Sequence, residues 1–186
     1  WIPKKGIYAE YKDALGNRIL HDSPGVWSIY QTIDAELSNP FENYQMLDYV
    51  NNQIPHIAID ADGLDKKDLY LISTTNWQPY TWSTNNVALA EQLHTSLAFW
   101  QGGQSEKAYT MWESALIESM YLGASPGGFE QLMFQDAMRG ELYRDFADPI
   151  GMASRTLVEG LFGIQPDAVN EVLTIKPGFP EKWENA

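Results

Sequence analysis

The sequence predicts a mainly α fold, built from helical hairpins with short β-structure at both ends of the chain. Apolar residues recur at helical spacing in several separate segments, and Asn-Pro, Asp-Pro and Gly-Gly pairs mark where those segments begin and end. Short runs of β-branched and aromatic residues beside turns lie near each end. With 186 residues, 44% of them hydrophobic, the chain is long enough to bury a sizeable core.

Both ends of the chain are expected to contain strands. Residues 1–22 form a lead-in whose segment 6–22 reads as a β-hairpin around the turn 13–17. Near the other end, Val172, Thr174 and Ile175 indicate a strand after a turn at Pro166-Asp167. We therefore expect helical hairpins over residues 23–166 and the start of a C-terminal β segment over 167–186.

The first helical hairpin is predicted from its start signals. Ser23-Pro24 is typical of an N-cap followed by proline. The inward apolar face of the helix that follows is expected to consist of Val26, Tyr30, Ile33 and Leu37. Asn39-Pro40 repeats the signal before a second helix that runs to Ile54. The stretch 56–82 is expected to be irregular, apart from a strand over 69–74.

Two further helices are predicted to pair through a short connection. The first is expected to be capped by Ser83 or Thr84 and to end at Gly102-Gly103, and the second runs over about 105–122. A last helix is expected to begin at Asp148-Pro149 and to end at Gly163.

Charge and cysteine content exclude several classes of function. The formal net charge is −13, and an acidic surface repels nucleic-acid phosphates and anionic membranes. Without cysteine the chain has no disulfide, no Cys-ligated metal and no thiol nucleophile. We expect no nucleic-acid partner, no membrane association and no cofactor, while a neutral sugar would bind unhindered.

Aromatic residues are abundant, with seven Trp and ten Tyr. Most such side chains belong to cores. Their flat apolar faces and polar edges also match the C–H face and hydroxyls of a pyranose ring, so some of them could bind a sugar.

The segment 136–148 concentrates charge between aromatic residues. It can be an arginine–carboxylate network that fixes a loop, with the last aspartate a plain helix cap, or it can be an active-site loop. Glycoside hydrolysis needs two carboxyl groups held in different protonation states. The charged members of the segment are Asp136, Arg139, Glu141, Arg144, Asp145 and Asp148.

Three other residues are candidates. Glu130 follows a Pro-Gly-Gly-Phe loop that could place a carboxylate over a cleft, although an ordinary exposed glutamate is an equal alternative. Glu91 and His94, three residues apart on one predicted helix, share a face and are expected to form a polar pair at the mouth of the helix bundle. No third ligand has metal spacing, so no metal site is predicted.

From Trp77 onward the chain resembles the six-hairpin glycosidase superfamily, whose members build an (α/α)6 toroid. The likeness is to the C-terminal part of rhamnosidase-like and phosphorylase-like domains that are frequent in gut bacteria. The matching stretches are Trp77–Ser83, Glu91–His94, Met120–Gly127, Arg139–Pro149, Val158–Asp167 and Ile175–Pro180.

The resemblance implies a site and a substrate class. By position Glu130, with Glu141 behind it, matches the later catalytic carboxylate of these relatives, whereas no residue here matches their general acid. Asp136, Asp145 and Asp148 would bind sugar hydroxyls or hold Arg139 and Arg144. The sugar subsites would be lined by Trp77, Tyr80 and Trp82. The implied ligand is an oligosaccharide or polysaccharide of plant or host origin, and the implied location is periplasmic or secreted.

Three functions remain open from the sequence. The first is a glycoside hydrolase fragment, since a full toroid has twelve helices and five are predicted here. The second is a non-catalytic carbohydrate-binding or scaffold module on the same fold. The third is a sugar epimerase, in which His94 would be the base. A partial toroid would expose apolar helix faces, so we expect self-association or a partner that supplies the missing N-terminal half.

Overall fold

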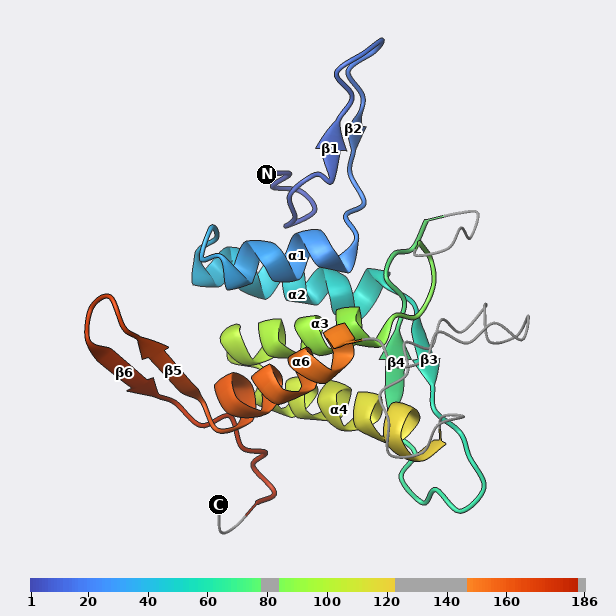
Figure 1. Cartoon of the computed structure of the whole chain (residues 1–186). Helices are drawn as coiled ribbons and strands as arrows, with labels where there is room; N and C mark the ends of the chain where they lie inside the picture. Colours follow the sequence, from blue (N-terminus) through green and yellow to red (C-terminus); the bar gives the residue numbers. More distant parts are fainter. Residues whose placement is uncertain (78–83, 123–146, 184–186) are drawn as a thin grey trace.

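The computed structural model describes residues 1–77, 84–122 and 147–183, and helices dominate this part of the chain (Figure 1). The helices are α1 (Val26–Asp34), α2 (Pro40–Gln53), α3 (Leu89–Gln101), α4 (Ser105–Leu116) and α6 (Ala147–Arg155). Two of them continue as π-helices, α4 into η1 (Ile117–Leu122) and α6 into η2 (Thr156–Leu161). The predicted combination of helices with short strands is present in these ranges, whereas the arrangement of the hairpins in a toroid stays a prediction.

Three antiparallel strand pairs accompany the helices within the described residues. They are β1 (Tyr11–Lys12) with β2 (Leu20–His21), β3 (His56–Ala58) with β4 (Tyr70–Ile72), and β5 (Ile164–Asp167) with β6 (Val172–Ile175). The first and last pairs project from the helical body as hairpins (Figure 1). The predictions of a hairpin in 6–22 and of strands over 69–74 and 172–175 are confirmed.

The two helices of the first hairpin begin in different ways. Asn39 and Glu42 form a reciprocal capping box at the start of α2, as the Asn-Pro signal predicted. Helix α1 starts at Val26, two residues after the predicted Pro24, and its N-cap residue is Gly25, which has no capping side chain. Glu10 from the β1 region replaces that cap, because its carboxylate accepts hydrogen bonds from the Gly25 amide and the Ser28 hydroxyl.

Helix α3 and the β3–β4 pair correct two predictions. Helix α3 begins at Leu89, several residues after the predicted cap. Residues 56–58 were expected to be irregular but form β3. The pair is secured by the buried Gln92 of α3, whose amide accepts a hydrogen bond from the Ile72 backbone and donates to the carbonyls of Tyr70 and Met111. A strand of three residues is too short to show an alternation of apolar and polar residues, so β3 could not be recognised from its own sequence.

The β5–β6 hairpin crosses the predicted domain boundary. Pro166 and Asp167 lie in β5 instead of forming a turn. The turn comes just after them, where the Asp167 carboxylate accepts hydrogen bonds from the backbone amides of Val169 and Asn170. The C-terminal β-structure therefore starts at Ile164.

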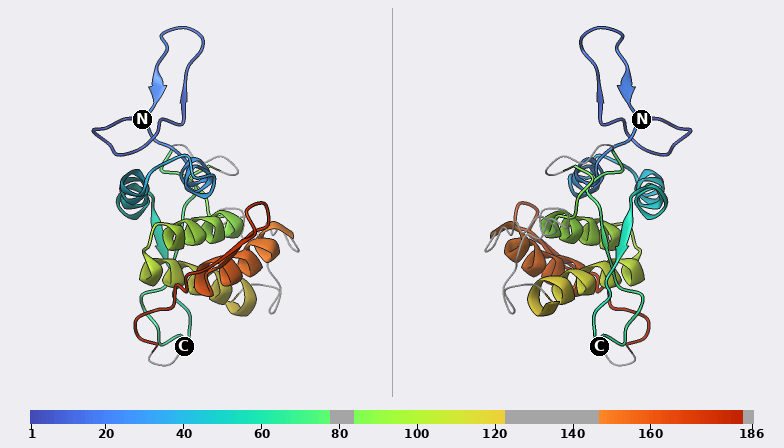
Figure 2. Two further views of the ribbon diagram at one scale, coloured as in Figure 1. Left: turned by 90° about the vertical axis from the view of Figure 1, so that its left-hand side faces the viewer. Right: turned by 90° about the vertical axis from the view of Figure 1, so that its right-hand side faces the viewer.

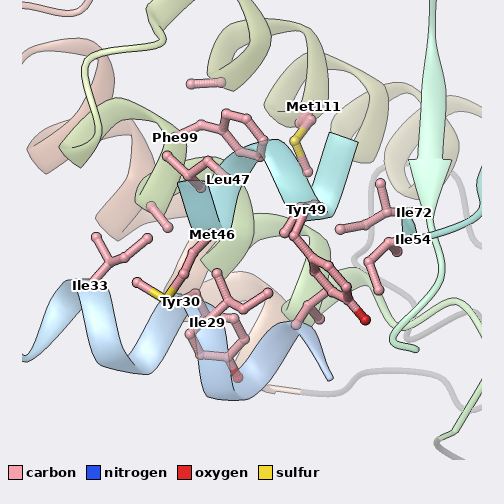
Figure 3. Packing of buried hydrophobic residues seen from close by; sticks show 14 of the residues in the cluster. Ile29, Tyr30, Ile33, Met46, Leu47, Tyr49, Ile54, Ile72, Phe99 and Met111 are labelled. Atoms are coloured by element: carbon pink, nitrogen blue, oxygen red, sulfur yellow. The ribbon is translucent and has the colours of Figure 1, made fainter. Parts of the chain in front are cut away.

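The main core lies between α1, α2 and α3 (Figure 3). Phe99, Leu47 and Ile29 are fully buried there, with Met111 of α4 beside them. Leu37, predicted on the inner face of the first helix, is 73% exposed because α1 ends before it. A second apolar cluster joins α3 to β4 and α6.

Helices α1, α3 and α6 run in the same direction. Tyr30 of α1 contacts His94 of α3, and farther along both helices Asp34 accepts a hydrogen bond from Gln101. Helix α6 follows the same order, since Asp148 lies near His94 and Arg155 binds Asp34.

Helices α2 and α4 run the opposite way. Gln92 and Ser96 of α3 donate hydrogen bonds to the carbonyls of Met111 and Ala108 of α4, so residue numbers rise along α3 where they fall along α4. The two directions are visible in Figure 1, and Figure 2 shows that α3 crosses α1 at an angle. As a result, the starts of α1, α3 and α6 gather at one end of the helical body, and their C-terminal ends gather at the other.

Candidate functional site

Three of the predicted site residues meet where α1, α3 and α6 begin, and we call this region the start end. Glu91 lies in the first turn of α3, His94 in the next turn, and Asp148 in the first turn of α6. His94 Nε2 lies 3.9 Å from Asp148 Oδ1. The structure therefore brings together residues from two segments that are far apart in the sequence.

His94 is held between helices. Its ring stacks on Tyr30 of α1, with centroids 4.5 Å apart and planes inclined by 9°. Burial lowers the pKa of His94, and the nearby Arg155 lowers it further, while Asp148 and Asp34 act in the opposite sense. The imidazole is thereby kept neutral and able to accept a proton or a hydrogen bond. Tyr30 was predicted only as a core position.

Glu91 is the most unusual acid among the described residues of this end. Burial raises its pKa, a hydrogen bond with Tyr30 lowers it, and the negative charge of Asp148 raises it again, with a net upward shift. Its Oε2 atom is buried, and no described residue forms a hydrogen bond with it. Such a carboxyl retains its proton to higher pH than a solvated one and has that proton available to donate.

Asp148 occupies a different environment from Glu91. Its side chain is 57% exposed, and it lies inside the first turn of α6, after Ala147, rather than at the cap. The plain N-cap interpretation of Asp148 is therefore wrong. A solvated carboxylate beside a buried carboxyl is the combination that separates the roles of base and acid.

Trp77 lies beside the start of α1. Its indole N–H donates a 2.6 Å hydrogen bond to the backbone carbonyl of Ser23, which precedes that helix. Its ring makes edge contacts with His21 and Trp27, at centroid distances of 4.6 and 5.8 Å. An aromatic residue predicted to bind sugar thus lies at the same end of the helical body as the carboxyl groups.

The remaining predicted site residues fall outside the described part of the chain. They are Tyr80, Trp82, Glu130, Asp136, Arg139, Glu141, Arg144 and Asp145. The roles predicted for them stay predictions. Their segments are continuous in sequence with residues just before α3 and α6.

The opposite end carries charged groups that the sequence did not single out. Arg155 donates hydrogen bonds to both carboxylate oxygens of Asp34 and to Glu159, and Gln101 also donates to Asp34. Burial alone would raise the pKa of Asp34, but the bonds from Arg155 and Gln101 outweigh it and lower that pKa. This network lines a cleft of about 910 Å³ together with Trp100.

Metal and membrane features were also sought in the described ranges. No group of three or more His, Asp or Glu side chains there is arranged to hold a metal ion. Within the same ranges, every helix is too short or too polar to cross a bilayer.

Comparison with known proteins adds no family. No protein-family model matches the chain, and no curated protein matches its sequence. The functional argument therefore depends on the residues and their geometry.

Proposed function

We propose that this chain is a carbohydrate-active protein that takes part in glycoside hydrolysis by carboxylate acid/base catalysis at the start end. The observation that carries the proposal is the pairing of two unlike carboxyl groups. Glu91 is partly buried, its Oε2 atom is fully buried without a partner among the described residues, and Asp148 is solvated on the neighbouring helix. Hydrolysis of a glycosidic bond requires such a difference between its two carboxyl groups.

The chemistry assigns a role to each environment. A protonated carboxyl donates its proton to the glycosidic oxygen as the bond from that oxygen to the anomeric carbon breaks. A second, ionised carboxylate either removes a proton from the attacking water or attacks the anomeric carbon itself. Glu91 suits the first role. Asp148 is the described candidate for the second, and Glu130 and Glu141 are the candidates from the sequence.

The surroundings suit a neutral, hydroxyl-rich ligand. Trp77 lies at this end, and the net charge of −13 opposes phosphorylated or strongly anionic substrates. Helices α1, α3 and α6 run one way and α2 and α4 the other, which is the alternation that successive hairpins of an α/α toroid require. We propose that the hairpins form part of such a toroid.

His94 supports a second candidate, a sugar epimerase. Its pKa is lowered mainly by burial, and its ring is fixed by stacking on Tyr30, so a neutral base is available beside Asp148. Epimerisation would require His94 and leave glycosidic bonds intact, so the two candidates differ in the product formed.

The test is hydrolysis of a panel of aryl glycosides and neutral oligosaccharides by the wild type, Glu91→Gln and Glu130→Gln. Glu159→Gln is the matched control, because it is the same substitution on η2, at the opposite end. We expect the wild type and the control to hydrolyse glycosides. Glu91→Gln should bind the same glycosides but should not hydrolyse them. Binding without turnover by any of the four proteins would favour the non-catalytic module, and an unchanged rate in Glu91→Gln would exclude Glu91 as the acid.

A further inference from the structure

Four aromatic side chains form a continuous row at the base of the β1–β2 hairpin. Tyr11 stacks on His21 with centroids 5.0 Å apart and planes inclined by 10°. His21 meets the edge of Trp77 at 4.6 Å, and Trp77 meets Trp27 at 5.8 Å. We call these residues, Tyr11, His21, Trp77 and Trp27, the aromatic row.

The row is fixed at its inner end and open at its outer end. The indole N–H groups of Trp27 and Trp77 donate to Glu10 and to the Ser23 carbonyl, at 2.7 and 2.6 Å. Tyr11, in contrast, is 57% exposed although one face of its ring is covered by His21. The second face of Tyr11 is therefore presented to solvent by rings that are already ordered.

A pre-ordered aromatic face has a specific use. An unsupported tyrosine on a surface loses side-chain freedom when a ligand stacks on it, whereas a tyrosine already stacked on His21 loses less. Apart from ligand binding, an exposed, well-supported ring on a two-stranded hairpin makes little contribution to the core. These observations favour a binding platform over a packing role.

The residues next to the row in the sequence carry polar groups that are able to bind hydroxyls. Asp22 and Ser23 follow His21 directly, and Asn76 precedes Trp77. All three line a cleft of about 430 Å³. Flat apolar rings next to carboxylate, hydroxyl and amide groups complement a pyranose, which has an apolar face and hydroxyl edges.

The row also lies at the same end of the molecule as Glu91 and Asp148. Trp27 belongs to the first turn of α1, the helix that contributes Tyr30 to the contact with His94. A ligand that extends from the start end toward the β1–β2 hairpin (Figure 1) would therefore meet Tyr11 at its far end.

We propose that the aromatic row is an outer carbohydrate subsite, in which the free face of Tyr11 stacks on a pyranose unit of a chain bound at the start end. The inference rests on the proposed carbohydrate function and adds a dependence on chain length. Short glycosides would occupy only the carboxyl region, whereas longer neutral oligosaccharides would also contact Tyr11.

The test is isothermal titration of the whole chain with disaccharides and hexasaccharides of β-1,4-linked glucose, xylose and mannose. The variants are Tyr11→Ala, Tyr11→Phe and the control Tyr44→Ala. Tyr44 is 58% exposed, matching Tyr11, but it lies on α2 and makes no ring contact with a described residue. Thermal melting of each variant checks that the fold is retained.

We expect Tyr11→Ala to weaken binding of the preferred hexasaccharide by roughly three- to tenfold, the range that one aromatic contact provides. Disaccharide binding should stay unchanged, as should both ligands in Tyr11→Phe and Tyr44→Ala. Equal hexasaccharide affinities for Tyr11→Ala and Tyr44→Ala would overturn the subsite.

The outcome separates this inference from the proposed function. Length-dependent binding that requires Tyr11, without turnover of any glycoside, would keep the subsite and reject the hydrolase. If turnover requires Glu91 but Tyr11→Ala binds the hexasaccharide normally, the hydrolase is kept and the subsite is rejected. A wild type that binds none of these saccharides would reject the subsite for neutral β-1,4-linked glycans.

Discussion

The two ends of the helices α1, α3 and α6 both carry carboxyl groups, but each carboxylate at one end has a cationic partner, whereas a buried carboxyl oxygen at the other end has no partner among the described residues. At the C-terminal end, Asp34, Arg155 and Glu159 share hydrogen bonds, and each carboxylate has a cationic partner. At the start end, Glu91 has a buried oxygen without a described partner, and its nearest described charge is the like-charged Asp148.

The difference shows why charge alone does not identify a site. A paired network stabilises helix packing and has little capacity left for a ligand. A buried carboxyl without an opposite charge costs folding free energy, and such a cost is common where a protein needs a perturbed acid. The start end is therefore the stronger candidate, although the larger cleft lies at the other end.

The largest expected effect concerns the leaving group. If Glu91 is the proton donor, Glu91→Gln should slow hydrolysis of oligosaccharides by about 10²–10⁴-fold, the usual contribution of a general acid. Dinitrophenyl glycosides should be affected far less, because their leaving group departs without protonation. Initial rates on both substrate types measure the ratio, and an equal loss on both would indicate a binding role for Glu91.

Stability should respond at the opposite end. Arg155→Met keeps the aliphatic stem but leaves Asp34 and Glu159 without their cation. Because about a third of each side chain reaches solvent, we expect a loss of about 1–3 kcal/mol in the free energy of unfolding, below the value for a fully buried pair. Urea unfolding measures this change in the free energy of unfolding. Glycoside turnover at saturating substrate should stay at the wild-type rate.

The two ends should also respond to pH with opposite signs. The pKa of Glu91 is raised above its ordinary 4.5, so the unfolded chain loses this proton first and the Glu91 contribution to stability falls as pH rises through that window. The pKa of Asp34 is lowered below 3.8, so its contribution is present above that value and is lost as pH falls through the folded pKa.

Melting temperatures of Glu91→Gln and Asp34→Asn, each compared with the wild type from about pH 3 to pH 8, test this contrast. As pH rises, the melting temperature of Glu91→Gln should rise relative to that of the wild type, and the melting temperature of Asp34→Asn should fall relative to it. Parallel pH profiles for the two variants would show that the ends do not differ in the way described.

The smallest effect is expected at a solvent-exposed ion pair beside the aromatic row. Lys5 and Asp22 form a 2.6 Å ion pair with about half of each side chain exposed. Lys5→Ala should leave the free energy of unfolding nearly unchanged, and any small loss should shrink further in high salt. A larger loss would mean that the loop 1–6 stabilises the fold in a way that this contact does not explain.

The sequence predicted those parts of the fold that depend on neighbouring residues. The capping box at Asn39 lies within four positions, and the start of α2 was placed correctly. The start of α1 was not, because its cap comes from Glu10 across a hairpin. Likewise β3 forms by pairing with β4, a strand that Gln92 from a much later helix holds through the Ile72 amide.

The site was predictable in part for the same reason. Glu91 and His94 share a helix face at a spacing that is visible in the sequence, but their contacts with Tyr30 and Asp148 come from the packing of three helices. Tyr30 looked like a core residue because its apolar spacing is that of a core residue. The aromatic row was missed because His21 and Trp77 are far apart in the sequence.

The π-helix η2 has a consequence for how this region can change over time. A π-helix contains one more residue per hydrogen-bonded ring than an α-helix, so removing one residue from Thr156–Leu161 would restore a regular α-helix. Because the π turn itself accommodates the extra residue, the deletion would shorten the turn, and the residues after Leu161 would keep nearly their present orientation. A single-codon deletion within Thr156–Leu161 would therefore convert the turn to α-helix while leaving the β5–β6 hairpin, and Gly178 against the ring of Trp100, in place.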